Sequence, residues 1–168
     1  MIKIENMKRI LEVGPGLNPL HYRHGDKERG VKLEGDEDYT VLDQPRADFN
    51  HRIWQTAKET YGERIHFVPG DRTEMPFEDE SFDELVSLGS FADEGRVIAE
   101  FQRVLRPGGI LRLGTTAKNA QIVMDNWGVR LKRLGFTLLE DQIQRYQYVQ
   151  RKDLSGCEYV VFVFKKGV

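Results

Sequence analysis

Cysteine is nearly absent from this sequence, and long apolar runs are missing. Cys157 is the only cysteine among 168 residues, which excludes an intramolecular disulfide and a cysteine-rich metal site. It lies beside an apolar stretch, where a small buried thiol is the simplest interpretation. No run approaches the ~18 apolar residues that span a bilayer, and the first residues lack the apolar segment of a signal peptide. We therefore expect a cytoplasmic protein with no membrane contact.

The sequence also lacks an excess of charge of either sign. Lys and Arg number 25 against 27 Asp and Glu, for a net charge of −2, so there is no global basic field to attract nucleic acid or an anionic membrane. Basic residues such as Arg130 and Arg145 alternate with apolar residues and glycine, which indicates a solvated face. We expect a small-molecule partner and no nucleic acid.

Strand-like and helix-like segments alternate as far as residue 135. This alternation predicts an α/β fold with a single doubly wound, mostly parallel sheet and helices on both faces. Residues 140–156 show no helical periodicity, so the last strand should be antiparallel. No linker or repeat divides the chain, and one domain over residues 1–168 is expected, without a separate substrate domain. The predicted strands are 9–13, 39–42, 64–68, 84–88, 110–114, 136–139 and 159–164, and the predicted helices are 47–61, 93–105 and 119–134.

The most informative stretch follows the first strand. Residues 10–13 are apolar except for Glu12 and lead into Gly14 and Gly16, where glycine lets the backbone turn sharply and approach a ligand. Asn18 followed by Pro19 predicts a helix start whose free N–H groups would line the pocket. The charged residues 26–38 are interpreted as a solvated loop.

Acidic residues follow the next two predicted strands. Asp43 ends the strand 39–42, and Asp71 follows the strand 64–68. Ligands of open parallel sheets bind outside the carboxyl ends of the strands. Two carboxylates there, beside a glycine turn, suit a nucleoside, because they can accept hydrogen bonds from ribose hydroxyls and an exocyclic amine.

At this point the sequence resembles the class I (Rossmann-like) S-adenosylmethionine-dependent methyltransferase family. The similarity runs in order from residue 10 to about 114, and the two final strands fit the β-hairpin end of that fold. The family implies a seven-stranded sheet. The motifs that carry the resemblance are Glu12-Val13-Gly14-Pro15-Gly16, Leu42-Asp43, Gly70-Asp71, residues 75–83 (MPFEDESFD) and residues 103–109 (RVLRPGG).

The resemblance implies a site for the methionine part of S-adenosylmethionine. Glu12 would orient its ammonium group through water, and Gly14 and Gly16 would let the backbone approach. The carbonyl region of Leu88 would face the same ammonium.

The resemblance also implies a nucleoside site. Asp43 would accept the ribose hydroxyls, and Gln44 would lie against the adenine. Asp71 would accept from the adenine amine, with the backbone N–H of Arg72 nearby.

The function that follows is methyl transfer from S-adenosylmethionine to an O, N or C nucleophile of a small acceptor. Alignment of an already activated methyl group is sufficient for such a reaction, so no catalytic residue is assigned. An NAD(P)-dependent oxidoreductase shares the sheet, but Pro19 replaces the third glycine of its fingerprint, and Asp71 also opposes it. A non-catalytic, cofactor-binding subunit that supports a partner is the other alternative. The reduced lid motivates it, because a short turn and a polar loop replace the usual long first helix over residues 17–38.

The acceptor side is less defined. His21 or His24 could be a general base, and together with Asp26 they could be read as a metal cluster. His-x-x-His without a fourth ligand is a poor metal site, so no metal is expected. Residues 17–38, 89–96 or 140–156, or a second subunit in a homodimer or hetero-complex, would have to complete the acceptor site. Asp93 and Glu94 could face an acceptor or favour the start of a helix.

Overall fold

The protein is described by a computed structural model. The structure describes residues 7–16, 19–23, 30–44, 48–89, 94–149 and 156–168. No helix among these residues is long and apolar enough to cross a membrane.

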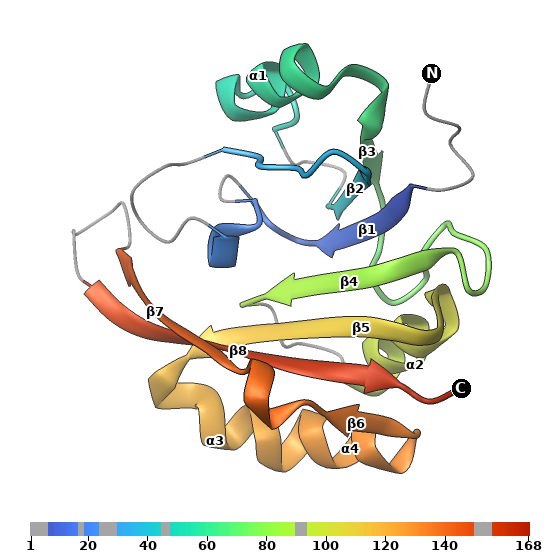
Figure 1. The fold of residues 1–168 in the computed structure, drawn as a ribbon, viewed down its shortest axis with the longest axis vertical. Coiled ribbons are helices and arrows are strands. Elements are labelled where there is room, and N and C mark those ends of the chain that lie inside the picture. The colour runs from blue at the N-terminus through green and yellow to red at the C-terminus, as the bar shows by residue number, and fades with distance from the viewer. Residues whose placement is uncertain (1–6, 17–18, 24–29, 45–47, 90–93, 150–155) are drawn as a thin grey trace.

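The described residues form an α/β fold around one eight-stranded sheet (Figure 1). The strands are β1 (Lys8–Val13), β2 (Glu37–Asp43), β3 (Ile65–Pro69), β4 (Phe82–Leu88), β5 (Leu105–Thr116), β6 (Phe136–Leu138), β7 (Gln144–Val149) and β8 (Gly156–Lys166). The α-helices are α1 (Arg52–Tyr61), α2 (Glu94–Val104), α3 (Ala120–Val123) and α4 (Val129–Arg133). A π-helical turn, η5 (Met124–Gly128), joins α3 to α4, and the 3₁₀ helices are η2 (His21–Arg23), η3 (Gly62–Arg64), η4 (Ala117–Asn119) and η6 (Glu140–Gln142).

The strand order is β3-β2-β1-β4-β5-β8-β6. β1 to β5 pair in parallel, whereas β8 runs antiparallel to β5, β6 and β7. In Figure 1 the arrowheads of β1, β4 and β5 point to one side and that of β8 points to the other. The predicted doubly wound, mostly parallel sheet with an antiparallel last strand is therefore confirmed.

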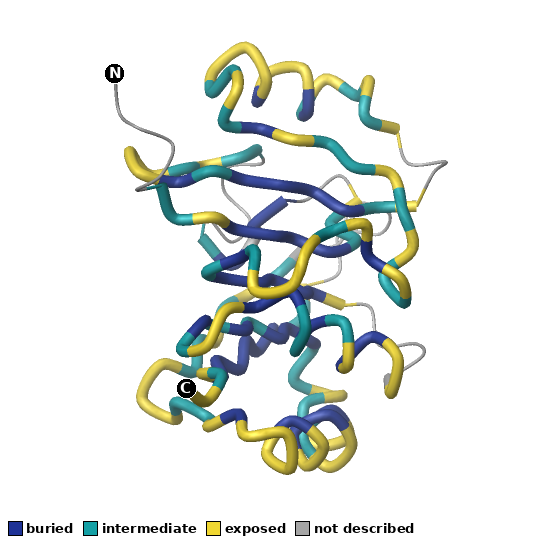
Figure 2. The backbone as a smooth tube through the Cα atoms, turned by 90° about the vertical axis from the view of Figure 1, so that its right-hand side faces the viewer, coloured by how far each residue is buried: buried dark blue, intermediate teal, exposed yellow. Residues whose placement is uncertain are grey.

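The two faces of the sheet bury different side chains. On one face, Leu11 and Leu111 pack with Phe101 of α2 and Trp127 of η5. On the other, Ile10 packs in a cluster that includes residues of β2, β3 and α1. Neighbouring residues of β1 serve opposite faces because strand side chains alternate. Figure 2 shows the buried middle of the strands and the exposed outer turns of the helices.

Several element boundaries shift from the sequence prediction, such as β5 over Leu105–Thr116 instead of 110–114, and three differences change the description of the fold. The helix expected over 47–61 begins at Arg52, after His51 accepts a hydrogen bond from the Ile53 N–H at 3.3 Å. The helix expected over 119–134 is interrupted by the π-helical turn. The number of strands is eight instead of the implied seven, because residues 144–149 pair with β8 as β7.

Two local predictions after β1 are wrong. Pro19 and Leu20 form a turn rather than a helix start, and η2 is a single 3₁₀ turn; Asn18 lies outside the described residues. The acidic segment before β2 is not uniformly solvated, because Glu37 is only 2% exposed. It begins β2 and bonds to Arg23, a partner that no local pattern reveals.

Candidate functional site

The predicted site residues lie at the carboxyl ends of the parallel strands. Gly14 follows β1, Asp43 ends β2, and Asp71 comes shortly after β3. The Gly14 N–H donates to the Leu42 carbonyl at 2.8 Å and ties the turn to β2. The fold therefore brings these residues to one edge of the sheet, on the side to which the arrowheads of β1 and β4 point (Figure 1).

The glycine turn is open above its backbone. Gly14 has φ = 64° and Gly16 has φ = 59°, and a Cβ built on either would meet no atom within 4 Å. Side chains rarely adopt this left-handed conformation, whereas glycine does so at little cost. The turn therefore exposes two bare stretches of main chain to any molecule above it.

Asp43 faces this turn from the neighbouring strand. Its carboxylate accepts the Gly16 N–H at 3.1 Å and the Gln44 N–H at 2.8 Å. A carboxylate can accept about four hydrogen bonds, so two bonds leave capacity for a pair of hydroxyl donors. Gln44 is exposed beside it.

Asp71 is exposed at the next strand end. Its Oδ1 accepts the Thr73 N–H at 2.8 Å and the Thr73 hydroxyl at 2.7 Å. The Thr73 backbone hydrogen bond, followed by the hydroxyl, lowers the pKa of Asp71 below its usual value. The carboxylate is held as an acceptor, with Arg72 half-buried next to it.

Glu12 is fully buried and bonded inside the protein. Its carboxyl group accepts the Leu20 N–H at 2.9 Å and 3.2 Å, and the Tyr39 hydroxyl at 2.5 Å. Burial raises the pKa of Glu12 to about 7, against the lowering effect of these bonds. Burial also raises the pKa of Tyr39 well above its usual value, so its hydroxyl keeps its proton and donates. The contacts seen for Glu12 therefore fix the return of the chain after the glycine turn.

The end of β4 lies against Tyr159 of β8. Leu88 is 9% exposed, and the Gly89 N–H donates to the Gly114 carbonyl at 3.0 Å. The Tyr159 hydroxyl also donates to the Gly114 carbonyl, at 3.3 Å, and lies 3.0 Å from where a Cβ on Gly89 would be. The Tyr159 side chain thus lies close to the backbone of Gly89, which has no side chain of its own.

The acceptor-side histidines are only partly placed. The backbone of His21 begins η2, whereas His24, Asp26 and Asp93 lie outside the described residues. Glu94 begins α2. Among the residues that the structure describes, no group of three or more His, Cys, Asp and Glu could hold a metal ion.

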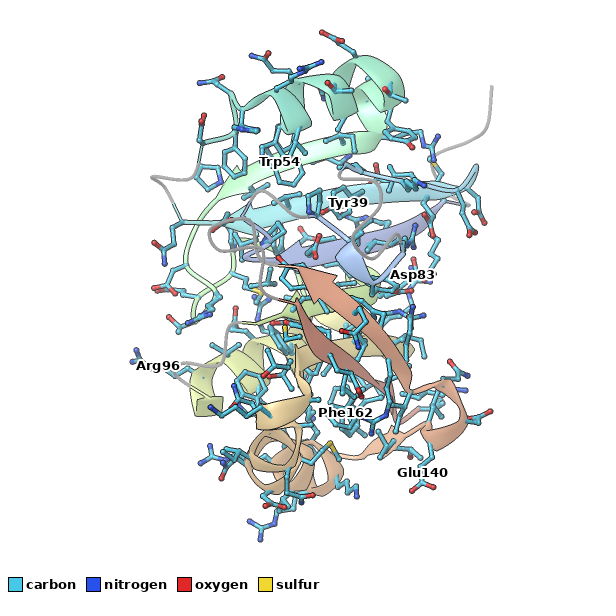
Figure 3. The ribbon with its side chains drawn as sticks, turned by 90° about the vertical axis from the view of Figure 1, so that its left-hand side faces the viewer. Tyr39, Trp54, Asp83, Arg96, Glu140 and Phe162 are labelled. Carbon is cyan, nitrogen blue, oxygen red and sulfur yellow. The ribbon has the colours of Figure 1, made fainter. Side chains whose placement is uncertain are left out.

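Sequence reasoning missed the buried polar residues on the α1 side of the sheet. Tyr39 and Tyr22 looked like ordinary strand and turn residues, and Tyr159 like a core residue. Arg112 carried a signal that could have been read, because it is the one charged residue of the apolar segment 110–114, whereas Glu84 stands beside Asp83 at the start of its predicted strand. Figure 3 shows Tyr39 on β2 below Trp54 of α1, and Phe162 between the strands and the helical segment 120–133.

Comparison with known proteins agrees with the fold. A family model for a methyltransferase domain matches residues 42–113. The chain is 36% identical over 107 residues to phthiotriol/phenolphthiotriol dimycocerosates methyltransferase 1 of Mycobacterium ulcerans, which covers 62% of this chain and 36% of that protein. The chain thus spans about a third of the length of this relative.

Solved structures share the architecture at low sequence identity. The 1,6-didemethyltoxoflavin-N1-methyltransferase of Burkholderia thailandensis, solved with 1,6-didemethyltoxoflavin and S-adenosylhomocysteine, has a TM-score of 0.64 at 17% identity and covers 98% of this chain and 73% of its own. A [4+2]-cyclase, SpnF, has a TM-score of 0.63 at 17% identity, covering 97% and 76%. The same fold therefore hosts more than one chemistry.

Proposed function

We propose that this chain, which belongs to the class I (Rossmann-like) S-adenosylmethionine-dependent methyltransferase family, binds S-adenosylmethionine and transfers its methyl group to a nucleophilic oxygen, nitrogen or carbon of a small acceptor. The observation that carries the proposal is the open turn at Gly14 and Gly16 with the Asp43 carboxylate directly beside it. The Asp43 carboxylate can accept hydrogen bonds from the hydroxyl groups of a ribose. The exposed main chain of the glycine turn leaves room for an amino-acid chain attached to that ribose.

The residues present fit this cofactor. Asp43 would accept the ribose hydroxyls with its remaining lone pairs, and Gln44 would lie against the adenine. Asp71 would accept from the adenine amine beside the Arg72 N–H. The low pKa of Asp71 keeps it an acceptor at neutral pH.

The methionine part would lie over Gly14 and Gly16 and reach toward Leu88. Glu12 has no exposed surface, so its part in the proposal is to hold the Leu20 N–H and the Tyr39 hydroxyl, with any effect on the ammonium passing through water. It is a positioning residue in this account.

The cofactor supplies a methyl group already activated on a sulfonium. What the chain contributes is alignment, which can be worth several kcal/mol in a two-substrate reaction. We place the acceptor near Gly89, where Tyr159 restricts the approach. No side chain is assigned as a general base. A second copy of the chain or a partner subunit would complete the acceptor site.

The relatives support a small acceptor and active catalysis. The names of the Mycobacterium and Burkholderia enzymes specify phthiotriol/phenolphthiotriol dimycocerosates and 1,6-didemethyltoxoflavin. The near-neutral charge of this chain does not suit a nucleic acid. These matches favour an enzyme over the non-catalytic subunit.

Calorimetric titration with S-adenosylmethionine and S-adenosylhomocysteine tests the proposal, with NAD as a specificity control. We expect one site that prefers the sulfur ligands. Asp43→Asn keeps one acceptor oxygen but cannot pair with both ribose hydroxyls, so binding should weaken at least tenfold, or about 1.4 kcal/mol.

Asp125→Ala is the matched control. Asp125 is exposed on η5 and accepts only from Gln121 in the described structure, so this variant should bind like the unmodified protein. Absence of binding by both sulfur ligands, or an equal affinity in the Asp43→Asn variant, would contradict the proposed function.

A further inference from the structure

A cavity lies at the end of β1 opposite the glycine turn. It has a volume of about 560 Å³, and its lining includes Lys8, Tyr22, Arg23, Glu37 and Arg112. Lys8 and Glu37 are the first residues of β1 and β2, whereas the glycine turn follows the last residue of β1. Six strand positions separate Lys8 from Gly14, which corresponds to about 20 Å. The cavity is therefore distinct from the proposed cofactor site.

Two glutamates under this cavity are almost fully buried and paired. Glu84, 1% exposed, accepts from Arg112 Nε at 2.7 Å and from Lys8 Nζ at 2.7 Å. Glu37, 2% exposed, binds the Arg23 guanidinium through both oxygens at 2.7 and 2.9 Å. A buried charge is costly unless it is paired, so these bonds hold the side chains in fixed positions.

The charge of this network does not balance. Burial alone would raise the pKa of Glu84, but Arg112 and Lys8 outweigh it and lower that pKa. Arg23 and Lys8 likewise lower the pKa of Glu37 against burial. Both acids are therefore ionised at neutral pH. Lys8, Arg23 and Arg112 exceed Glu37 and Glu84 by one positive charge, and the exposed pair Lys32 and Glu34, which also lines the cavity, leaves that excess unchanged.

Arg112 is the cation of this network that is best placed to bind an anion from solution. Its Nε bonds to Glu84, and its guanidinium lies over the Tyr22 ring at 5.1 Å. Tyr22 is fixed in turn, because its hydroxyl donates to Glu84 at 3.1 Å. Within the described structure, the two terminal amino groups of Arg112 have no hydrogen-bond acceptor, although the residue is only 22% exposed. A rigid guanidinium edge of this kind matches a carboxylate or phosphate through two parallel bonds.

The walls of the cavity are also held in place. Gln144 Nε2 of β7 donates to the Tyr22 carbonyl at 2.7 Å, so this bond joins β7 to η2. Arg23 NH1 donates to the Lys32 carbonyl at 2.9 Å. The guanidinium edge of Arg112 therefore lies in an open cavity whose walls are held by hydrogen bonds, which reduces the ordering cost of binding.

We infer that this cavity binds the oxyanion group of a small anion, a carboxylate or a phosphate, against the terminal amino groups of Arg112 with Lys8 beside it. The site goes beyond the proposed methyl transfer and does not depend on it. The remaining positive charge sets the preference for an anion, and the planar guanidinium edge sets the preference for an oxyanion over chloride.

Titrations with inorganic phosphate and with acetate, at constant ionic strength in chloride, test this inference. We expect saturable one-to-one binding followed by calorimetry. Arg112→Gln should weaken it at least tenfold, and Arg112→Lys should give an intermediate loss, because it keeps the charge but not the two parallel donors. Tighter phosphate binding would assign a phosphate ester, and tighter acetate binding would assign a carboxylate.

Arg133→Gln is the control, because Arg133 is an exposed cation on α4 and does not line the cavity. It should bind both probes like the unmodified protein. Circular dichroism checks the fold of each variant, and Arg112→Lys carries the test if Arg112→Gln does not fold. The inference is overturned if neither probe binds saturably, or if the Arg112 and Arg133 variants lose affinity equally.

Discussion

At the scale of single residues, the buried carboxyl group of Glu12 has the largest consequence. It lies directly before the glycine turn, yet its hydrogen bonds go to Leu20 and Tyr39 inside the protein. The Leu20 N–H belongs to a residue with φ = 46°, a conformation that costs non-glycine residues roughly 1–2 kcal/mol. The Glu12 bond offsets that cost and holds the chain as it leaves the turn.

The raised pKa of Glu12 predicts a pH dependence of stability. Its folded pKa of about 7 is above its ordinary value of 4.5, so the folded state binds the proton more tightly. The stabilisation is complete below pH 4.5 and is lost as the pH rises to about 7. The full difference corresponds to about 3 kcal/mol. Urea unfolding at pH 4.5 and pH 8 measures it.

The matched variants are Glu12→Gln and Glu59→Gln. Glutamine cannot titrate, so the change in unfolding free energy between these two pH values should shift by about 3 kcal/mol in Glu12→Gln. Glu59 is exposed on α1, and its variant should follow the unmodified protein. An identical pH profile for all three proteins would contradict the role given to Glu12.

The glycine turn allows a second test at this scale. Gly16→Ala places a Cβ at φ = 59°, and Gly62→Ala does so at φ = 57° after α1, each in open space. Positive φ should cost each variant about 1 kcal/mol of stability or more, and Gly62, with ψ = −121°, at least as much as Gly16. Only Gly16→Ala should also weaken binding of S-adenosylhomocysteine, since Gly62 is remote from the turn. Thermal unfolding and calorimetry separate the two effects, and equal binding by both variants would remove Gly16 from the site.

At the scale of elements, Arg103 explains why two distant motifs occur together. From α2 it donates to the carbonyls of Phe77 at 2.6 Å and Met75 at 3.0 Å, and to Glu100 at 2.8 Å. Glu100 in turn accepts the Met75 N–H at 2.6 Å. The arginine of residues 103–109 thus fastens the segment before β4 to α2.

Arg103→Ala should therefore destabilise the protein by about 2 kcal/mol, because it removes charge-assisted bonds to two main-chain carbonyls. Arg106→Ala is the comparison, since Arg106 is 49% exposed and paired with Asp83 at the surface. Its cost should stay below about 1 kcal/mol. Chemical unfolding of both variants tests this, and equal losses would mean that the fastening contributes little.

The same scale shows what could be predicted from the sequence. The strands and long helices were recoverable because their periodicity and glycine ends are local. The helix start at Pro19 failed because the Leu20 N–H bonds to Glu12, which is distant from any capping pattern. Glu37 was misread because its partner Arg23 approaches only in the folded chain. β7 is missing from the predicted strands because residues 144–149 mix Gln, Arg and Tyr without an apolar run.

At the scale of the whole molecule, one sheet connects all described elements from β3 to β6. The sequence predicts one domain over residues 1–168, and a shared sheet supports cooperative unfolding. Fluorescence of Trp54 and Trp127, which pack on opposite faces, and far-ultraviolet circular dichroism should report the same urea midpoint. Separate midpoints would indicate two independently unfolding parts.

The central claim is the position of the cofactor at the carboxyl ends of β1 to β3. The most direct measurement is a titration of ¹⁵N-labelled protein with S-adenosylhomocysteine, followed through the assigned amide signals. The account predicts the largest changes at Gly14, Gly16, Gln44 and Arg72, and little change at Lys8 at the other end of β1. The absence of saturable changes, or changes confined to the residues around Lys8, would contradict it.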